Sequence, residues 1–127
     1  VLEVIGDHAF DGCSLLNSSY VTVNNPFTLP TTVKEIGAYA YKGCTSIKNI
    51  DLSNLANLTV YETGVFSGCT ALVSVNFNGV SGLKIRTGAF NGCTLLKKGG
   101  LYVNGVNNVV LLQGAIELDS FDFGIED

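Results

Sequence analysis

The sequence predicts a solenoid, a fold in which one short unit is stacked on itself. The dipeptide Gly-Cys occurs four times, and each copy begins two residues after an aromatic ring. The four rings are Phe10, Tyr41, Phe66 and Phe90, and they are separated by 31, 25 and 24 residues. Self-similarity at a period in the twenties is typical of stacked repeat folds. The recurring residues are therefore expected in the core, and any function in the residues that vary.

The composition sets limits on the fold and the partners. The chain has 127 residues, of which 46% are hydrophobic and 14% are charged, with a net charge of -4. This length and apolar content predict one domain with a real core. The seven Lys and Arg residues are scattered, which argues against a nucleic-acid partner. No apolar run reaches the roughly 18 residues of a membrane span, so we expect no membrane insertion.

The repeat units set the expected domain organisation. Four full copies share a small residue, a ring, one variable residue, Gly-Cys and then Ser or Thr, and we place them at residues 1–31, 32–56, 57–80 and 81–106. A decayed copy at 107–127 has Ile116 in the ring position and Asp119 in the Cys position. Terminal repeats are atypical because one face meets water. The acidic residues 117–127 fit a cap, and their spacing matches no calcium loop. Because Val1 already lies in repeat sequence, we expect the chain to begin within a longer protein.

Each Gly-Cys is followed by a strand signal. Residues 47–52 and 72–77 share the form L-x-x-L-x-L, and the last part of each alternates apolar and polar side chains, as a half-buried strand does. Residues 20–23 and 101–103 are the expected equivalents in the first and fourth units, each displaced by about two residues. Stacked copies would pair these strands in parallel. A second apolar pair before each ring predicts a second inward-facing side, and the surplus of the long first interval predicts a bulge over 24–30.

The pattern Ile-Gly-x-x-Ala-Phe-x-Gly-Cys-Ser/Thr-x-Leu resembles the BspA-like leucine-rich repeats, over roughly residues 1–116. The pattern departs from the family at Tyr61-Glu62 and Ile85-Arg86, which replace Ile-Gly. The resemblance implies an α/β fold, a right-handed leucine-rich-repeat solenoid with a parallel sheet on one face. Within that fold we expect four full repeats and a degenerate terminal one. The resemblance also implies a cell-surface or secreted setting and a role in adhesion or protein binding.

The four Cys residues share one column of the repeat, and three readings are open. A ladder of buried free thiols is favoured because free Cys behaves as a small buried hydrophobe. Disulfides are disfavoured because side chains that point in parallel suit the bond geometry poorly. A zinc site is disfavoured because the sequence has no Cys-x-x-Cys motif and because the sole histidine, His8, lies in a variable position. We therefore expect no metal and no cofactor.

No catalytic set is visible in the sequence. His8 shares its column with Tyr39, Gly64 and Gly88, so the repeat does not favour a catalytic base at this position. No nucleophile, base and acid can be assembled around it. We expect a surface histidine without a role, and a protein that is not an enzyme.

The strand positions that point away from the core form the candidate binding face. By alternation these are Tyr20, Thr22, Asn49, Asp51, Ser74, Asn76 and Tyr102. Exposed Tyr among small polar residues is typical of protein recognition surfaces. We expect a non-enzymatic module that binds a protein or a glycan through this face. A plain solvated sheet face, a structural spacer, and an accessory domain of an enzyme outside this chain are the alternatives.

Overall fold

The computed structural model describes residues 2–16, 26–55, 57–58, 60–77, 84–86, 88–96 and 100–102. Its strands are short, and all of their pairings are parallel. In chain order they are β1 (Val4–Ile5), β2 (Phe27–Thr28), β3 (Glu35–Ile36), β4 (Asn49–Asp51), β5 (Val60–Tyr61), β6 (Ser74–Asn76), β7 (Lys84–Ile85) and β8 (Leu101–Tyr102). Each pairing joins a strand to its counterpart in the next unit.

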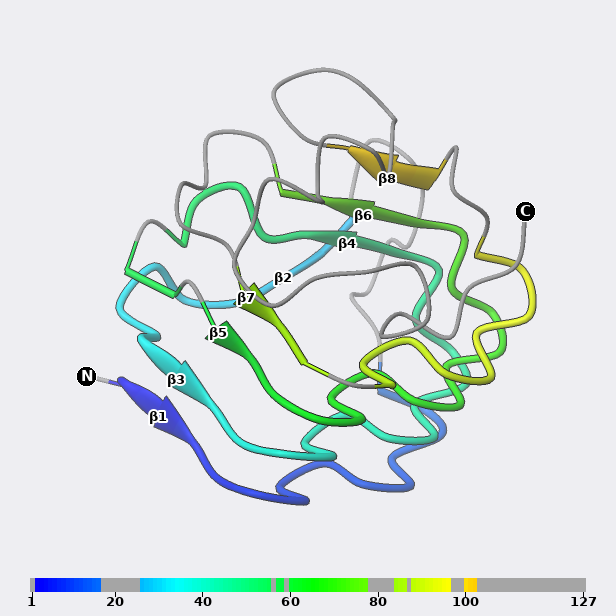
Figure 1. The fold of residues 1–127 in the computed structure, drawn as a ribbon, viewed down its shortest axis with the longest axis horizontal. Helices are drawn as coiled ribbons and strands as arrows, with labels where there is room; N and C mark the ends of the chain where they lie inside the picture. The colour runs from blue at the N-terminus through cyan, green and yellow to red at the C-terminus, as the bar shows by residue number, and fades with distance from the viewer. Residues whose placement is uncertain are drawn as a thin grey trace.

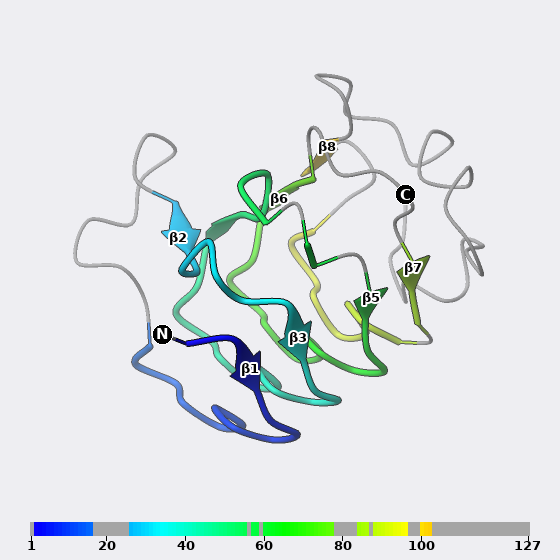
Figure 2. The same cartoon turned by 90° about the vertical axis from the view of Figure 1, so that its left-hand side faces the viewer.

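The strands make two sides of the molecule. Strands β2, β4, β6 and β8 form one four-stranded sheet in that order, and β1–β3 and β5–β7 form two pairs on the second side (Figure 1). Figure 2 shows β1, β3, β5 and β7 following one another across the molecule, with β2, β4 and β6 behind them. The predicted parallel pairing and the predicted second apolar side are both confirmed. Ile5, Ile36, Tyr61 and Ile85 all point inward there and are buried.

Turns form the third side, and their backbones also join neighbouring units. The amide of Phe10 donates to Ala40 O at 2.7 Å, and that of Tyr41 donates to Val65 O at 2.9 Å. In every copy the glycine of Gly-Cys has a φ between +71° and +79°. A second left-handed residue lies four positions earlier in each copy. Two left-handed residues so close together prevent an α-helix.

The α/β class that the resemblance implied therefore predicts more helix than the described residues contain. The described residues hold strands and turns and no α-helix, and the observed architecture is a β-rich repeat fold. None of them lies in a helix that could cross a bilayer.

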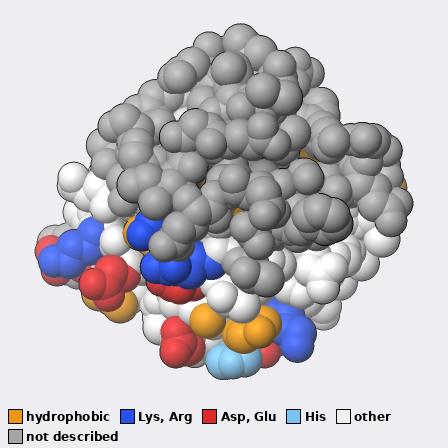
Figure 3. Space-filling view, in the orientation of Figure 1, with side chains coloured by type: hydrophobic (Ala, Val, Ile, Leu, Met, Phe, Trp, Pro, Cys, Tyr) orange, Lys and Arg blue, Asp and Glu red, His pale blue; other side chains and the backbone are white. Residues whose placement is uncertain are grey.

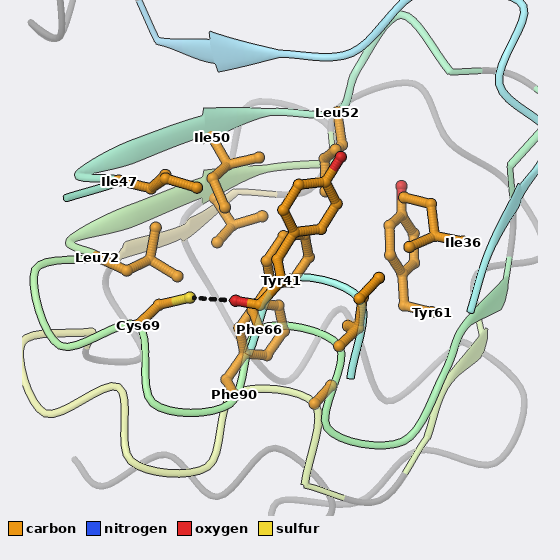
Figure 4. Packing of buried hydrophobic residues seen from close by; sticks show 14 of the residues in the cluster. Ile36, Tyr41, Ile47, Ile50, Leu52, Tyr61, Phe66, Cys69, Leu72 and Phe90 are labelled. Atoms are coloured by element: carbon orange, nitrogen blue, oxygen red, sulfur yellow. Dashed lines mark hydrogen bonds between the residues drawn. The ribbon is translucent and has the colours of Figure 1, made fainter. Parts of the chain in front are cut away.

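The aromatic column forms the centre of the core (Figure 4). Tyr41 stacks on Phe10 at a centroid distance of 5.2 Å, and Phe66 stacks on Tyr41 and on Phe90 at 5.6 Å each. Tyr41, Phe66 and Phe90 are at most 1% exposed, whereas Phe10, at the end of the described column, is 36% exposed. The predicted core of aromatic rings is confirmed, and its first ring, Phe10, is partly exposed.

The cysteine column lies beside the rings, and all four thiols are free. The Sγ atoms of Cys44, Cys69 and Cys93 donate to the carbonyl of the ring residue one unit earlier, at 3.1–3.2 Å. Burial, followed by the charges of the neighbouring Cys69 and Cys13, raises the pKa of the Cys44 thiol to about 12. The free-thiol prediction is confirmed. Cys13 differs from the other three because it is only partly buried.

The strand of the first unit lies later than the sequence predicted. The strand that pairs with β4 is β2, at Phe27–Thr28, inside the segment expected to bulge. The surplus of the first interval therefore precedes the strand and does not follow it. The predicted strand at 20–23, the decayed copy at 107–127 and the acidic end all lie outside the described residues.

One buried polar atom in the described core has no partner. The hydroxyl of Tyr61 makes no hydrogen bond, although the Tyr61 side chain is 0% exposed. Its ring is held edge-on by Phe77 at 5.3 Å. Burial of this hydroxyl raises the pKa of Tyr61. An unpaired buried hydroxyl costs about 1–3 kcal/mol, because its bonds to water are lost and not replaced.

Replacing Tyr61 by Phe is therefore expected to stabilise the protein by about 1 kcal/mol, because the ring stays and the unpaired hydroxyl goes. Equilibrium urea unfolding, followed by circular dichroism, measures the change. Tyr61→Ile is the matched control, since Ile occupies this position in three other copies. It loses the contact with Phe77 and should destabilise. A Tyr61→Phe protein less stable than the wild type would show that the hydroxyl has a partner.

Candidate functional site

The candidate site is the outer face of the four-stranded sheet. In β4 and β6 the middle residues, Ile50 and Val75, are buried, and the flanking residues are partly exposed. The predicted alternation is therefore confirmed. Parallel register aligns the flanking side chains in rows across the strands. One row consists of Thr28, Asp51, Asn76 and Tyr102, and a shorter one pairs Asn49 with Ser74.

The longer row, named here the polar row, crosses all four strands of the sheet. Neighbouring strands lie about 4.8 Å apart, so the polar row spans roughly 14 Å. Its two end members are the most open, since Thr28 is exposed and Tyr102 is 36% exposed. The row offers hydroxyl, carboxylate and amide groups side by side. It can therefore both donate and accept hydrogen bonds along an extended partner.

Hydrogen bonds within the face fix several of these side chains. Ser74 Oγ donates to Asn49 Oδ1 across the strands at 2.6 Å. Asp51 Oδ1 accepts from the Ser53 amide at 2.9 Å and from Ser53 Oγ at 2.5 Å. This carboxylate therefore holds the turn that follows β4, as Asp side chains commonly do. Asp51 has a structural role that the sequence reasoning did not foresee.

The structure adds Thr28 to the predicted face and leaves two predicted members undescribed. Tyr20 and Thr22 lie outside the described residues. The position of Thr28 could have been found by counting backwards from the next ring. The buried strand residue precedes the next ring by 16 residues for Ile50, 15 for Val75 and 14 for Phe27. Counting forwards from Phe10 fails because the long insertion lies between the ring and the strand.

The side chains with catalytic potential, the His8 imidazole and the cysteine thiols, lie away from the sheet face and already contact other groups of the protein. His8 Nδ1 lies 2.8 Å from Asp11 Oδ2 on the turn side of the first unit. The neighbouring Cys93 thiol and burial raise the pKa of Cys69, so its thiol is a protonated hydrogen-bond donor. Within the described ranges, no cluster of three or more His, Cys, Asp or Glu side chains is placed to hold a metal ion.

The repeat pattern, the parallel strands and the ring column agree with one known family. The model of the BspA type leucine rich repeat region matches residues 3–110 in six copies. No curated protein and no solved structure matches the chain. The family match covers most of the sequence and includes every strand described above. The chain therefore belongs to the BspA-type leucine-rich repeat family.

Proposed function

We propose that this chain is a non-enzymatic binding module of a cell-surface or secreted protein. Its partner is a protein, held adhesin-like against the outer face of the four-stranded sheet. The whole chain would form a right-handed solenoid of four full repeats and a degenerate terminal one. Proteins with BspA-type repeats are commonly surface-associated, which supports the setting.

The polar row is the observation that carries this proposal. Four outward side chains lie in register on four adjacent strands, over a core of stacked rings. Such a face is rigid before the partner arrives, so little entropy is lost when a partner binds. Repeat proteins commonly bind through extended faces of this kind.

A non-enzymatic role is supported by the state of the reactive groups. Cys44, Cys69 and Cys93 are at most 4% exposed and donate to backbone carbonyls, whereas a nucleophilic Cys must be accessible to its substrate. His8 contacts Asp11 and Tyr39, and neither contact supplies a nucleophile for it to activate. These groups build the fold and its surface.

One observation favours the second candidate, a structural spacer. The side chains of Asn49 and Ser74 bond to each other, and Asp51 bonds to Ser53. Part of the face is thus satisfied internally, as it would be in a sheet that only meets water. The two end members of the polar row decide between the candidates, because they are the most open.

The test uses arginine at these two ends. Thr28→Arg with Tyr102→Arg adds bulk and charge to the face without touching a buried side chain. Binding to immobilised collagen, laminin and fibronectin is measured by surface plasmon resonance. If the wild type binds, the double variant should bind at least about tenfold more weakly, a loss of about 1.4 kcal/mol.

The matched control is Thr70→Arg, which adds the same side chain at an exposed position on the turn side. It should bind as the wild type does. Equal binding by all three proteins would reject the sheet face as the binding surface. Absence of binding by the wild type to every matrix protein would favour the spacer.

A further inference from the structure

One column of the repeat carries two aromatic side chains that the backbone does not require. His8, Tyr39, Gly64 and Gly88 are equivalent, and their φ angles are +57°, +58°, +63° and +68°. This left-handed conformation suits glycine and costs other residues about 1 kcal/mol or more. Two of the four copies have glycine, so the fold tolerates it here. His8 and Tyr39 therefore have strained backbone conformations that glycine would avoid. Any benefit of these two residues must come from their side chains.

The two side chains form an aromatic platform at the surface, defined here as the stacked rings of His8, which is exposed, and Tyr39, which is half-buried. Their centroids lie 5.1 Å apart, and their planes differ by 17°. The Tyr39 ring covers Gly64 so closely that a Cβ there would lie 2.3 Å from Cε1. The His8 side chain remains 57% exposed. This platform is separate from the buried ring column of the core.

Polar groups of both kinds border the platform. Asp11 Oδ2 lies 2.8 Å from His8 Nδ1 and fixes the imidazole plane, and the Asp11 side chain is 35% exposed. Lys42 Nζ lies 5.5 Å from the centre of the Tyr39 ring. Figure 3 shows histidine, hydrophobic and charged side chains together at this edge of the molecule. A ligand on the platform would meet a carboxylate acceptor and an ammonium donor.

A groove of about 660 Å³ begins beside the platform. Asp7 and Ala38 line it, and they directly precede the two platform residues in the chain. The amide of Ala38 donates to Asp7 Oδ1 at 2.9 Å, which ties the two units together there. The other charged lining residues are Lys34, Glu35, Glu62 and Arg86. Small-molecule sites typically measure about 300–1,000 Å³, so the groove is large enough for a ligand.

We propose that the platform and the groove form a saccharide-binding site, distinct from the sheet face. A pyranose ring has an apolar C–H face, which packs on an aromatic ring, and a rim of hydroxyls that donate and accept. The exposed His8 ring supplies the ring face, because the Tyr39 ring is covered by His8 and packs against Gly64, and Asp11 and Lys42 supply the acceptor and the donor. A protein hot spot would instead need a larger buried apolar area. The polar groove would take the next sugar of an oligosaccharide.

The experiment uses cellotriose, maltotriose and chitotriose as neutral probes. Because His8 is the only histidine, its imidazole C–H resonances report on the platform alone. Titration followed by proton NMR should show saturable shifts of these resonances with at least one probe, and saturation transfer from the imidazole protons should reach that sugar. Absence of shifts with all three probes would overturn the proposal.

The decisive variant is His8→Gly with Tyr39→Gly, which installs the residue that the other two copies already have. The backbone should accept it, and circular dichroism checks the fold. Affinity for the sugar, measured by isothermal titration calorimetry, should fall about tenfold or more, as expected for loss of ring stacking. Unchanged affinity would overturn the proposal. Should the variant fail to fold, the saturation transfer in the wild type decides.

The control keeps this site separate from the proposed function. Thr28→Arg on the sheet face should leave sugar affinity unchanged, and the double glycine variant should leave protein binding at the sheet unchanged. Loss of sugar binding in Thr28→Arg would place the sugar on the sheet and overturn the platform assignment.

Discussion

Replacing Phe66 by alanine is expected to lower the free energy of unfolding by about 3–5 kcal/mol. The ring is 0% exposed and lies between two others, Tyr41 and Phe90, at 5.6 Å on each side. Its removal leaves a cavity that the stacked units cannot close, because backbone hydrogen bonds fix their spacing. A domain of this size has about 5–15 kcal/mol of stability in total. The variant should therefore lose a large share of its stability and unfold at a clearly lower temperature than the wild type.

Thermal unfolding by calorimetry and urea titration measure this effect. Phe10→Ala is the matched control, because Phe10 occupies the same column but is 36% exposed and, among the described rings, stacks on Tyr41 only. It should cost clearly less than Phe66→Ala. Equal costs for the two variants would mean that the rings contribute through their own units and not through the stack.

The stack could be predicted from the sequence because it is encoded by periodic features. The phased rings and Gly-Cys pairs require one column of neighbours in each unit, and parallel stacking provides it. The alternation in 47–52 and 72–77 likewise predicted which side chains of β4 and β6 point outward. At these positions the local sequence pattern and the tertiary packing favour the same arrangement, so the pattern was sufficient to predict it.

Other features depend on interactions that no single unit encodes. The position of β2 follows from pairing with β4, and an insertion after the first ring hid it from a forward count. The absence of an α-helix in the described residues follows from left-handed backbone, which Gly64 and Gly88 indicated in the sequence but His8 and Tyr39 did not. The turn held by Asp51 could have been suspected from Asp and Ser two residues apart. The platform and its groove bring two units together in space, so neither unit alone could have revealed them.

Replacing Gly37 by alanine is expected to destabilise the protein by about 1–3 kcal/mol, the usual cost of an overpacked contact. A Cβ at this position would lie 2.4 Å from the backbone nitrogen of Asp7 and 2.7 Å from the carbonyl carbon of Gly6. Both atoms belong to the neighbouring unit. Its backbone cannot move away freely, because the Gly37 amide donates to Ile5 O at 2.8 Å. The added methyl must therefore strain this bond or separate the two units.

Gly6→Ala is the matched control, because Gly6 has the same place one unit earlier and a Cβ there would meet nothing within 4 Å. It should be neutral, or stabilising by about 0.4–1 kcal/mol through a less flexible unfolded chain. The two variants are compared by urea unfolding at equal protein concentration. The third and fourth units have Glu62 and Arg86 at this position, paired at 3.3 Å, so the close approach is a property of the first two units. If Gly37→Ala proved as stable as Gly6→Ala, the first two units would not be packed more tightly at Gly37 than the other units are, and the prediction would be wrong.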